Sequence, residues 1–243
     1  MALAGNPNTG KSSVFNALTG LRQHTGNWPG KTVGRAEGRY SFGGRRFKLV
    51  DLPGTYSLLS ASQDEEIARD FILFGRPDCT VVVVDVTALE RNLNLVLQVL
   101  EITDRVVVCA NLMDEARRLD LAVDIEALSR ELGVPVVPTS ARTGSGLTDL
   151  MREVDAVASG KHHPRPRLVH PASEVERAAD ELEAMILRAA PGLASARWVA
   201  YRLLDGDVRV RRALEAGELA DLVQAQKLPP PLSNPRLALE GHP

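Results

Sequence analysis

The sequence predicts an α/β domain with a mostly parallel sheet, followed by a small all-helical domain. Runs of β-branched residues alternate with helical patterns as far as about residue 158. A glycine-rich loop separates the first short apolar run from the first helical pattern. Beyond residue 160 helical patterns continue and strand patterns cease. Together these features indicate a doubly wound sheet with ligands expected at the carboxyl ends of its strands.

The elements follow in a regular order. The run 1–5 leaves room for one short strand, and Lys11–Thr19 has the apolar spacing of a helix that ends at Gly20. Gly43-Gly44 predicts a hairpin turn between the strand patterns 38–42 and 46–54. Further strands are expected at 80–86, 105–111 and 134–140, and helices at 90–102, 124–133 and 146–158.

The composition predicts a soluble protein without a leader or a membrane span. The chain has 243 residues, 44% of them hydrophobic and 25% charged. No apolar run approaches the roughly 20 residues that span a bilayer. The net charge of −2 gives no overall case for binding nucleic acid or an anionic membrane. Cys79 and Cys109 lie in or beside apolar runs, so we expect buried thiols in a reducing, cytoplasmic compartment.

A change of amino-acid composition near residue 160 predicts a domain boundary. Residues 159–173 are rich in proline and histidine, as linkers are. The segments 173–190, 194–206, 207–217 and 218–226 have helical patterns that favour a small bundle. We therefore expect domains at 1–160 and 161–228 and a flexible tail at 229–243, where proline is frequent.

Residues 5–12 form the pattern G-x-x-x-x-G-K-S, which is typical of a phosphate-binding loop. Its backbone N–H groups and the following helix N-terminus favour an anion. Lys11 is expected at the β- and γ-phosphates, and the Ser12 hydroxyl at Mg²⁺. The predicted nucleotide contacts of this loop are Gly5, Asn6, Pro7, Asn8, Thr9, Gly10, Lys11, Ser12 and Ser13.

Two further segments are expected to contact the γ-phosphate and the metal. In "DLPG", Asp51 is predicted to hold Mg²⁺ through water, and the Gly54 N–H to meet the γ-phosphate. In "GNWPGKTVG", Thr32 is the predicted third Mg²⁺ ligand of a mobile switch, with Thr25 as the rival. The predicted contacts are Gly30, Lys31, Thr32, Asp51, Leu52, Pro53 and Gly54.

Two strand ends predict a site for guanine. The Asp114 carboxylate of "NLMD" can accept hydrogen bonds from guanine N1–H and the 2-amino group, donors that adenine lacks. Asn111 is expected to brace the surrounding loops, and backbone N–H groups of "TSA" to meet guanine O6. The predicted contacts are Asn111, Leu112, Met113, Asp114, Thr139, Ser140 and Ala141. With the phosphate loop, these motifs favour a P-loop NTPase domain of the Ras-like type, a G domain.

The set of motifs resembles the bacterial ferrous iron transport protein B family. It comprises "GNPNTGKSSVFNALTG", "GNWPGKTVG", "DLPGTYSL", "DEEIARDF", "ERNLNLVLQVLE", "NLMDEA" and "TSARTGSGL", within residues 1 to about 158. The resemblance implies a cytosolic GTPase domain, a helical domain like a guanine-nucleotide-dissociation inhibitor, and then membrane helices. It implies a regulatory switch on the cytoplasmic side of the inner membrane. Its partners would be guanine nucleotide and the membrane part of the same protein, with a possible homo-oligomer and no nucleic acid.

Particular residues refine the expected chemistry. Leu112 replaces the lysine that many GTPases place over the base, so we expect weak binding and fast GDP release. Thr55 follows "DLPG" where Ras-like enzymes have glutamine, so hydrolysis should be slow. Asn8 matches the asparagine that the resemblance implies as a K⁺ ligand. The expected catalytic residues are Lys11, Thr32, Gly54 and Asn8.

Lys31 departs from the family pattern, which usually has an apolar residue there.

Two other classes of protein remain alternatives. A soluble RNA- or ribosome-associated GTPase can carry a similar loop, although the near-neutral helical region argues against it. An ATP-dependent kinase or ATPase is disfavoured by "NLMD" and "TSA".

Overall fold

The computed structural model describes residues 1–20, 23–28, 32–59, 62–168, 171–193 and 195–220. The chain divides into two compact units, residues 1–169 and 170–243. The first unit is an α/β domain and the described part of the second is helical, as the sequence predicts. None of the helices in these described ranges has the length and apolar character needed to cross a membrane.

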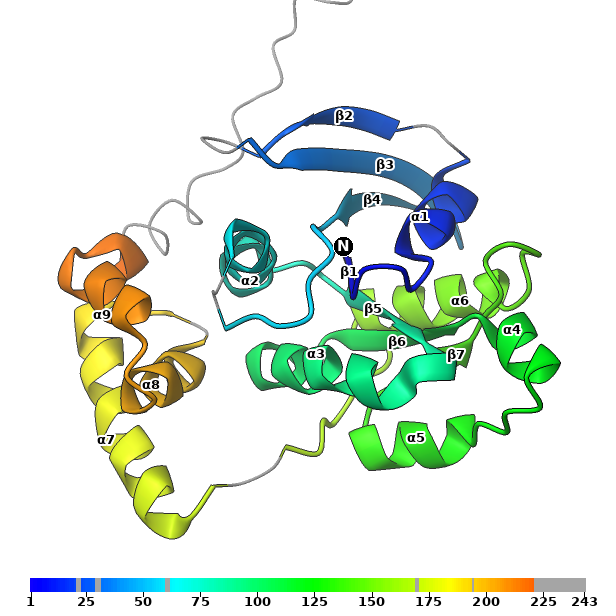
Figure 1. Cartoon of the computed structure of the whole chain (residues 1–243). Coiled ribbons are helices and arrows are strands. Elements are labelled where there is room, and N and C mark those ends of the chain that lie inside the picture. The colour runs from blue at the N-terminus through cyan, green and yellow to red at the C-terminus, as the bar shows by residue number, and fades with distance from the viewer. Residues whose placement is uncertain (21–22, 29–31, 60–61, 169–170, 194, 221–243) are drawn as a thin grey trace, which may run out of the picture. The chain divides into compact units, whose positions relative to one another are not determined.

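The first unit is built on a mixed sheet with the strand order β2-β3-β4-β1-β5-β6-β7 (Figure 1). Its strands are β1 (Ala2–Gly5), β2 (Gln23–Asn27), β3 (Gly34–Phe42), β4 (Arg45–Asp51), β5 (Thr80–Asp85), β6 (Val106–Asn111) and β7 (Val136–Pro138). The strand β3 runs antiparallel to both neighbours, and every other pairing among the described strands is parallel. The mostly parallel sheet confirms the predicted fold class.

Buried apolar strands form the centre of the sheet. Residues 80–84 of β5 and all of β6 are buried, as near-continuous β-branched runs predict for strands covered on both faces. The β3–β4 hairpin turns at Gly43-Gly44, both with positive φ, which confirms the predicted turn. The strand β7 is shorter than the predicted 134–140, although Val134 is buried beside it.

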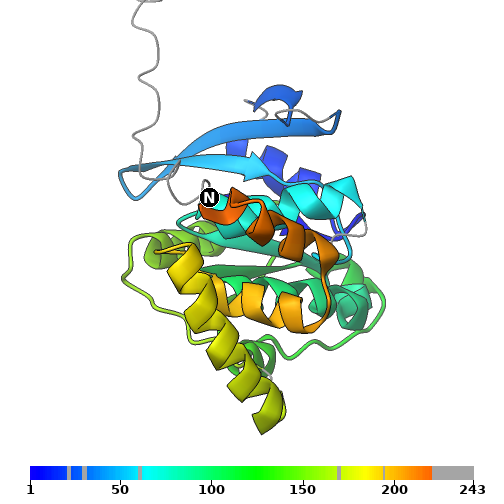
Figure 2. The ribbon, with the colours of Figure 1, turned by 90° about the vertical axis from the view of Figure 1, so that its left-hand side faces the viewer.

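Helices cover both faces of this sheet (Figures 1 and 2). The helices α1 (Lys11–Thr19) and α6 (Leu147–Ala158) pack on one face. On the other lie α2 (Gln63–Gly75), α3 (Leu89–Ile102) and α5 (Ile125–Leu132). The short α4 (Met113–Arg118) follows β6, and a 3₁₀ turn (Val86–Ala88) precedes α3. The predicted bounds of α1 match the structure, and those of α3 and α6 agree within a residue.

The structure also contains β2, α2 and α4, which the sequence patterns do not predict. β2 is a polar edge strand, held by its backbone pairing with β3 rather than by a buried apolar face. α2 has local signals, because the Ser62 side chain accepts a hydrogen bond from the Glu65 N–H and three acidic residues occupy its first turn. Ile67, Ala68, Ile72 and Leu73 supply its buried face.

The second unit contains α7 (Ser173–Ala189), α8 (Ala196–Leu204) and α9 (Val208–Glu215). Arg197 of α8 pairs with Glu176, Asp180 and Glu183 of α7, and its guanidinium lies 5.1 Å from the Tyr201 ring centre. This one side chain therefore links two helices of the bundle. The predicted tail 229–243 lies outside the described residues.

The contact between α1 and β3 requires a glycine at position 38. A Cβ atom there would clash with Thr19 Cγ2 and would lie 2.9 Å from Thr19 Cβ and 3.1 Å from Phe15 Cζ. We expect Gly38→Ala to lower the free energy of unfolding by about 1–3 kcal/mol, the usual cost of overpacking a core. Urea unfolding followed by circular dichroism measures this loss of stability as a lower transition midpoint.

Gly34→Ala is the matched control, because Gly34 lies on the same strand and a Cβ atom added there would meet no atom of the other described residues within 4 Å, its two chain neighbours aside. Its midpoint should stay near that of the parent protein. Equal midpoints for both variants would contradict the close packing of α1 on β3.

Candidate functional site: a nucleotide-binding edge

Four loops meet at one edge of the sheet because their strands run in the same direction. The strands β1, β4, β6 and β7 are followed by the phosphate loop, "DLPG", "NLMD" and "TSA". β1 lies between β4 and β5, where connections leave in opposite directions, which is the usual ligand position in such sheets. The predicted site residues of these four motifs therefore come from neighbouring loops.

The phosphate loop is a tight backbone turn against the sheet. Asn8 and Gly10 have φ values of 67° and 79°, a region that asparagine and glycine tolerate best. A Cβ atom at Gly10 would clash with the Asn111 side-chain amide, and one at Gly5 would lie 2.7 Å from the Val83 carbonyl oxygen. The two glycines of the motif thus permit close packing as well as the turn.

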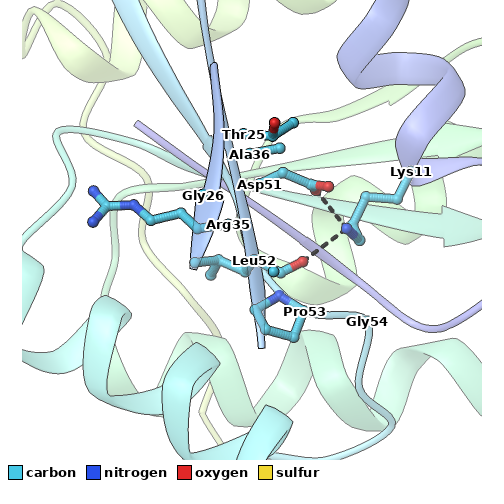
Figure 3. A pocket seen from close by; sticks show the side chains of 10 residues that line it. Lys11, Thr25, Gly26, Arg35, Ala36, Asp51, Leu52, Pro53 and Gly54 are labelled. Carbon is cyan, nitrogen blue, oxygen red and sulfur yellow. Dashed lines mark hydrogen bonds and ion pairs between the residues drawn. The ribbon is translucent and has the colours of Figure 1, made fainter. Parts of the chain in front are cut away.

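Lys11 lies against the "DLPG" loop, 40 residues away in sequence. Its ammonium pairs with Asp51 Oδ1 and donates a 2.7 Å hydrogen bond to the Leu52 carbonyl oxygen (Figure 3). Burial raises the pKa of the Asp51 carboxyl, and the Lys11 charge opposes that rise. Two residues predicted to contact phosphate and metal are therefore in direct contact.

A pocket of about 300 Å³ opens beside this ion pair. Residues of β2, β3 and the "DLPG" loop line it together with Lys11 (Figure 3). Thr25 is one of these lining residues, whereas Thr32 is exposed and does not line the pocket. The predicted contacts Gly30 and Lys31 lie outside the described residues.

Asn111 connects the phosphate loop to the loop after β7. Its side chain is 1% exposed, its Nδ2 donates to the Thr9 carbonyl oxygen at 2.9 Å, and its Oδ1 accepts from the Ala141 N–H at 3.0 Å. The Thr139 hydroxyl also donates to Oδ1, at 3.3 Å. This geometry is the bracing arrangement that the sequence suggests for Asn111.

Asp114 already has protein partners. Its backbone N–H donates to Ser140 Oγ at 3.1 Å, and Arg142 Nη2 donates to its Oδ2 at 2.8 Å. The hydrogen bond from Arg142 is the main cause that holds the pKa of this carboxyl below its usual value. The carboxylate is therefore ionised at neutral pH and able to accept hydrogen bonds.

The backbone N–H groups of "TSA" also have protein acceptors in this structure. Thr139 N–H donates to the Ala110 carbonyl oxygen, Ser140 N–H to that of Ser145, and Ala141 N–H to Asn111 Oδ1. Leu112 adopts a left-handed conformation with φ 65° at the start of α4. The Met113 N–H donates to the Thr139 carbonyl oxygen at 3.1 Å, so the "NLMD" and "TSA" loops are hydrogen-bonded to each other.

Side chains of α3 that sequence reasoning did not assign hold the segment after "DLPG". Gln98 Oε1 accepts from the Leu58 N–H at 2.6 Å and the Ser57 hydroxyl at 3.2 Å. Asn94 Nδ2 donates to the Tyr56 carbonyl oxygen at 3.3 Å. The polar positions of "ERNLNLVLQVLE", spaced four residues apart, are the only sequence signal for this contact.

Thr55 is 4% exposed, and its hydroxyl donates to the Ser57 carbonyl oxygen at 2.6 Å. Its backbone N–H donates to the Gly5 carbonyl oxygen at 3.3 Å. The Thr55 hydroxyl is thus engaged within its own loop.

Two family models match the chain. Residues 1–154 match ferrous iron transport protein B, and residues 172–228 match the FeoB cytosolic helical domain. The chain belongs to the ferrous iron transport protein B family. It contains the N-terminal G domain of this family, and the resemblance inferred from the motifs is confirmed.

Relatives and solved structures agree with this assignment. The Fe(2+) transporter FeoB of Escherichia coli (strain K12) is 41% identical over 231 residues, which cover 93% of this chain and 29% of the relative. The cytosolic domain of T. maritima FeoB in apo form matches with a TM-score of 0.79 and 35% identity, over 92% of this chain and 95% of that one. Its GMPPNP form matches over the same shares with a TM-score of 0.78 and 35% identity. A mutant of S. thermophilus NFeoB bound to GDP matches with a TM-score of 0.79 and 33% identity, over 92% of this chain and 87% of that one.

The bracing role of Asn111 predicts a large stability effect. In Asn111→Ala the buried Thr9 carbonyl oxygen and Ala141 N–H lose this partner. We expect the free energy of unfolding to fall by about 1–3 kcal/mol, the cost of an unsatisfied buried polar group. Urea unfolding measures this loss.

Asn94→Ala serves as the control, since Asn94 is exposed and makes a long 3.3 Å bond to the Tyr56 carbonyl oxygen. That variant should change stability by no more than about 0.5 kcal/mol. A small and equal effect in both variants would argue against the brace.

Proposed function

We propose that this chain binds guanine nucleotides with Mg²⁺ and hydrolyses GTP to GDP and phosphate. The observation that carries the proposal is that the Lys11–Asp51 ion pair and the Asp114 carboxylate lie at the same edge of the sheet. Lys11 lies in the phosphate loop beside Asp51, and Asp114 lies at the end of β6, joined to that loop through Asn111. The G domain assignment and the GDP and GMPPNP forms of related proteins support it.

The predicted metal ligands are oxygen donors of the kind that Mg²⁺ prefers. Ser12 is exposed at the start of α1, so its hydroxyl can take a ligand. Asp51 would hold Mg²⁺ through water. Thr32 is the proposed third ligand, and the place of Thr25 on the pocket wall keeps it as the alternative. Bound Mg²⁺ would neutralise charge on the phosphates.

Hydrolysis would depend on positioning rather than on a side-chain base. The Gly54 N–H is proposed to contact the γ-phosphate and Lys11 the β- and γ-phosphates. Because the Thr55 hydroxyl is engaged with the Ser57 carbonyl oxygen, this threonine does not serve as a base, and we expect low turnover. We further propose that K⁺, held in part by the exposed Asn8 side chain, stabilises charge in the transition state.

For the parent protein we propose a regulatory role in ferrous iron transport at the cytoplasmic side of the bacterial inner membrane. The chain spans under a third of the length of the related transporters. Nucleotide-driven motion of the segments around Thr32 and Asp51 would pass through the helical domain to a membrane part. We keep 1–160 and 161–228 as the proposed domains and 229–243 as a proposed tail, with a possible homo-oligomer and no nucleic-acid partner.

Competition against a fluorescent GDP analogue tests nucleotide selectivity. Unlabelled GDP and GTP should displace the analogue, and ATP should not. ITP lacks the 2-amino donor and XTP places an oxygen there, so both should bind at least about 10-fold more weakly. Asp114→Ala should lower GDP affinity by at least about 10-fold for the same reason.

Asp149→Ala removes a solvent-exposed carboxylate of α6 and should leave GDP affinity unchanged. Equal binding of ITP and GTP, or displacement by ATP, would contradict guanine selectivity. A parent protein that binds no nucleotide would overturn the proposed function.

The role of Asn8 is tested by phosphate release in K⁺ and in Na⁺ at equal ionic strength. The parent protein should turn over faster in K⁺, because K⁺ adds positive charge beside the phosphates. Asn8→Ala should show equal rates in both salts. The control Asn16→Ala changes an asparagine of α1 outside the loop and should keep the preference. Equal parent rates in the two salts would remove the K⁺ proposal.

A further inference from the structure

The Asp114 carboxylate is paired with a cation of the protein itself. Arg142 Nη2 lies 2.8 Å from Asp114 Oδ2, and the side chains are 77% and 20% exposed. Arg142 follows the "TSA" segment, 28 residues beyond Asp114 in sequence. The pair therefore forms across two loops that the proposed nucleotide site brings together.

The loop after β7 holds the Arg142 backbone in place. Ser140 N–H donates to the Ser145 carbonyl oxygen at 3.0 Å, and Thr143 N–H donates to that of Ser140 at 3.0 Å. Ser140 Oγ also accepts the Asp114 N–H at 3.1 Å. Since both backbones are fixed, only the two side chains must be ordered to form the ion pair, which lowers its entropic cost.

Arginine and guanine compete for the same carboxylate oxygens. A guanidinium and the N1–H and 2-amino edge of guanine both present parallel N–H donors that fit a carboxylate. A guanine base that donates hydrogen bonds to both Asp114 carboxylate oxygens must either displace the Arg142 N–H from Oδ2 or donate to Oδ2 together with Arg142. We propose that Arg142 is an affinity-determining residue, which occupies Asp114 in the nucleotide-free protein and must be displaced by guanine. The proposal rests on the proposed function.

The size of the effect follows from the exposure of the pair. Exposed ion pairs are weak, so about 50–85% of such pairs are expected to be formed at any time. Since only the open fraction binds the base, the pair reduces apparent affinity by about two- to six-fold. In this proposal the reduction acts on the association rate, because the ion pair must open before the base can bind. High salt should remove it by screening the pair.

Stopped-flow fluorescence with a labelled GDP tests the proposal on the full chain. Arg142→Ala and Arg142→Gln should each raise the association rate constant and the affinity by about two- to six-fold at low salt. The dissociation rate constant should stay unchanged. In about 1 M NaCl the parent and both variants should converge, since the Debye length falls to about 3 Å.

Arg152→Ala is the matched control, because it removes one exposed arginine from α6 of the same unit, where Arg152 pairs with Asp149. It should leave both rate constants unchanged, which separates the local contact from a general loss of positive charge. Unchanged or weaker GDP binding in both Arg142 variants would overturn the inference while the proposed function stands. Absence of GDP binding in the parent would instead overturn the proposed function.

Discussion

The hydrogen bonds of Asn111 are the interaction on which the rest of the site depends. The phosphate loop follows β1, and the loops that carry Asp114 and Ala141 follow β6 and β7, two and three strands away in the sheet. Parallel strands bring these loops to one edge but do not fix them to each other. The buried Asn111 amide does so, because it bonds to Thr9 on one side and Ala141 on the other. Gly10 completes the arrangement, since any side chain there would clash with this amide.

A second set of contacts joins the phosphate loop to the segment after "DLPG". Asn6 Nδ2 lies 3.4 Å from the Arg91 carbonyl oxygen at the start of α3, and the Arg91 guanidinium lies 5.7 Å from the Tyr56 ring centre. Further along α3, Asn94 and Gln98 bond to residues 56–58. The helix α3 therefore contacts both the phosphate loop and the segment after "DLPG".

Much of the fold follows from local sequence, and the contacts within the site only partly do. The β-branched runs at 80–86 and 105–111 predict β5 and β6, because such composition is typical of strands buried on both faces. β2 escapes prediction because its stability comes from pairing with β3 rather than from its own residues. The pairing of Arg142 with Asp114 depends on two distant loops meeting, so no spacing in the sequence indicates it. The position of Thr25 near Asp51 likewise comes from strand register, in which both residues pair with Ala36 of β3.

The cluster around Arg197 gives the helical unit an uneven tolerance to substitution. The Arg197 guanidinium forms ion pairs with Glu176, Asp180 and Glu183. Its Nε also donates a hydrogen bond to the Tyr201 hydroxyl at 3.3 Å. If a substitution removes one of these three carboxylates, Arg197 still has the other two as counter-charges. Loss of the arginine leaves three neighbouring carboxylates without this shared compensation. A single substitution at one acidic position of α7 should therefore disturb this cluster less than a substitution of Arg197 in α8.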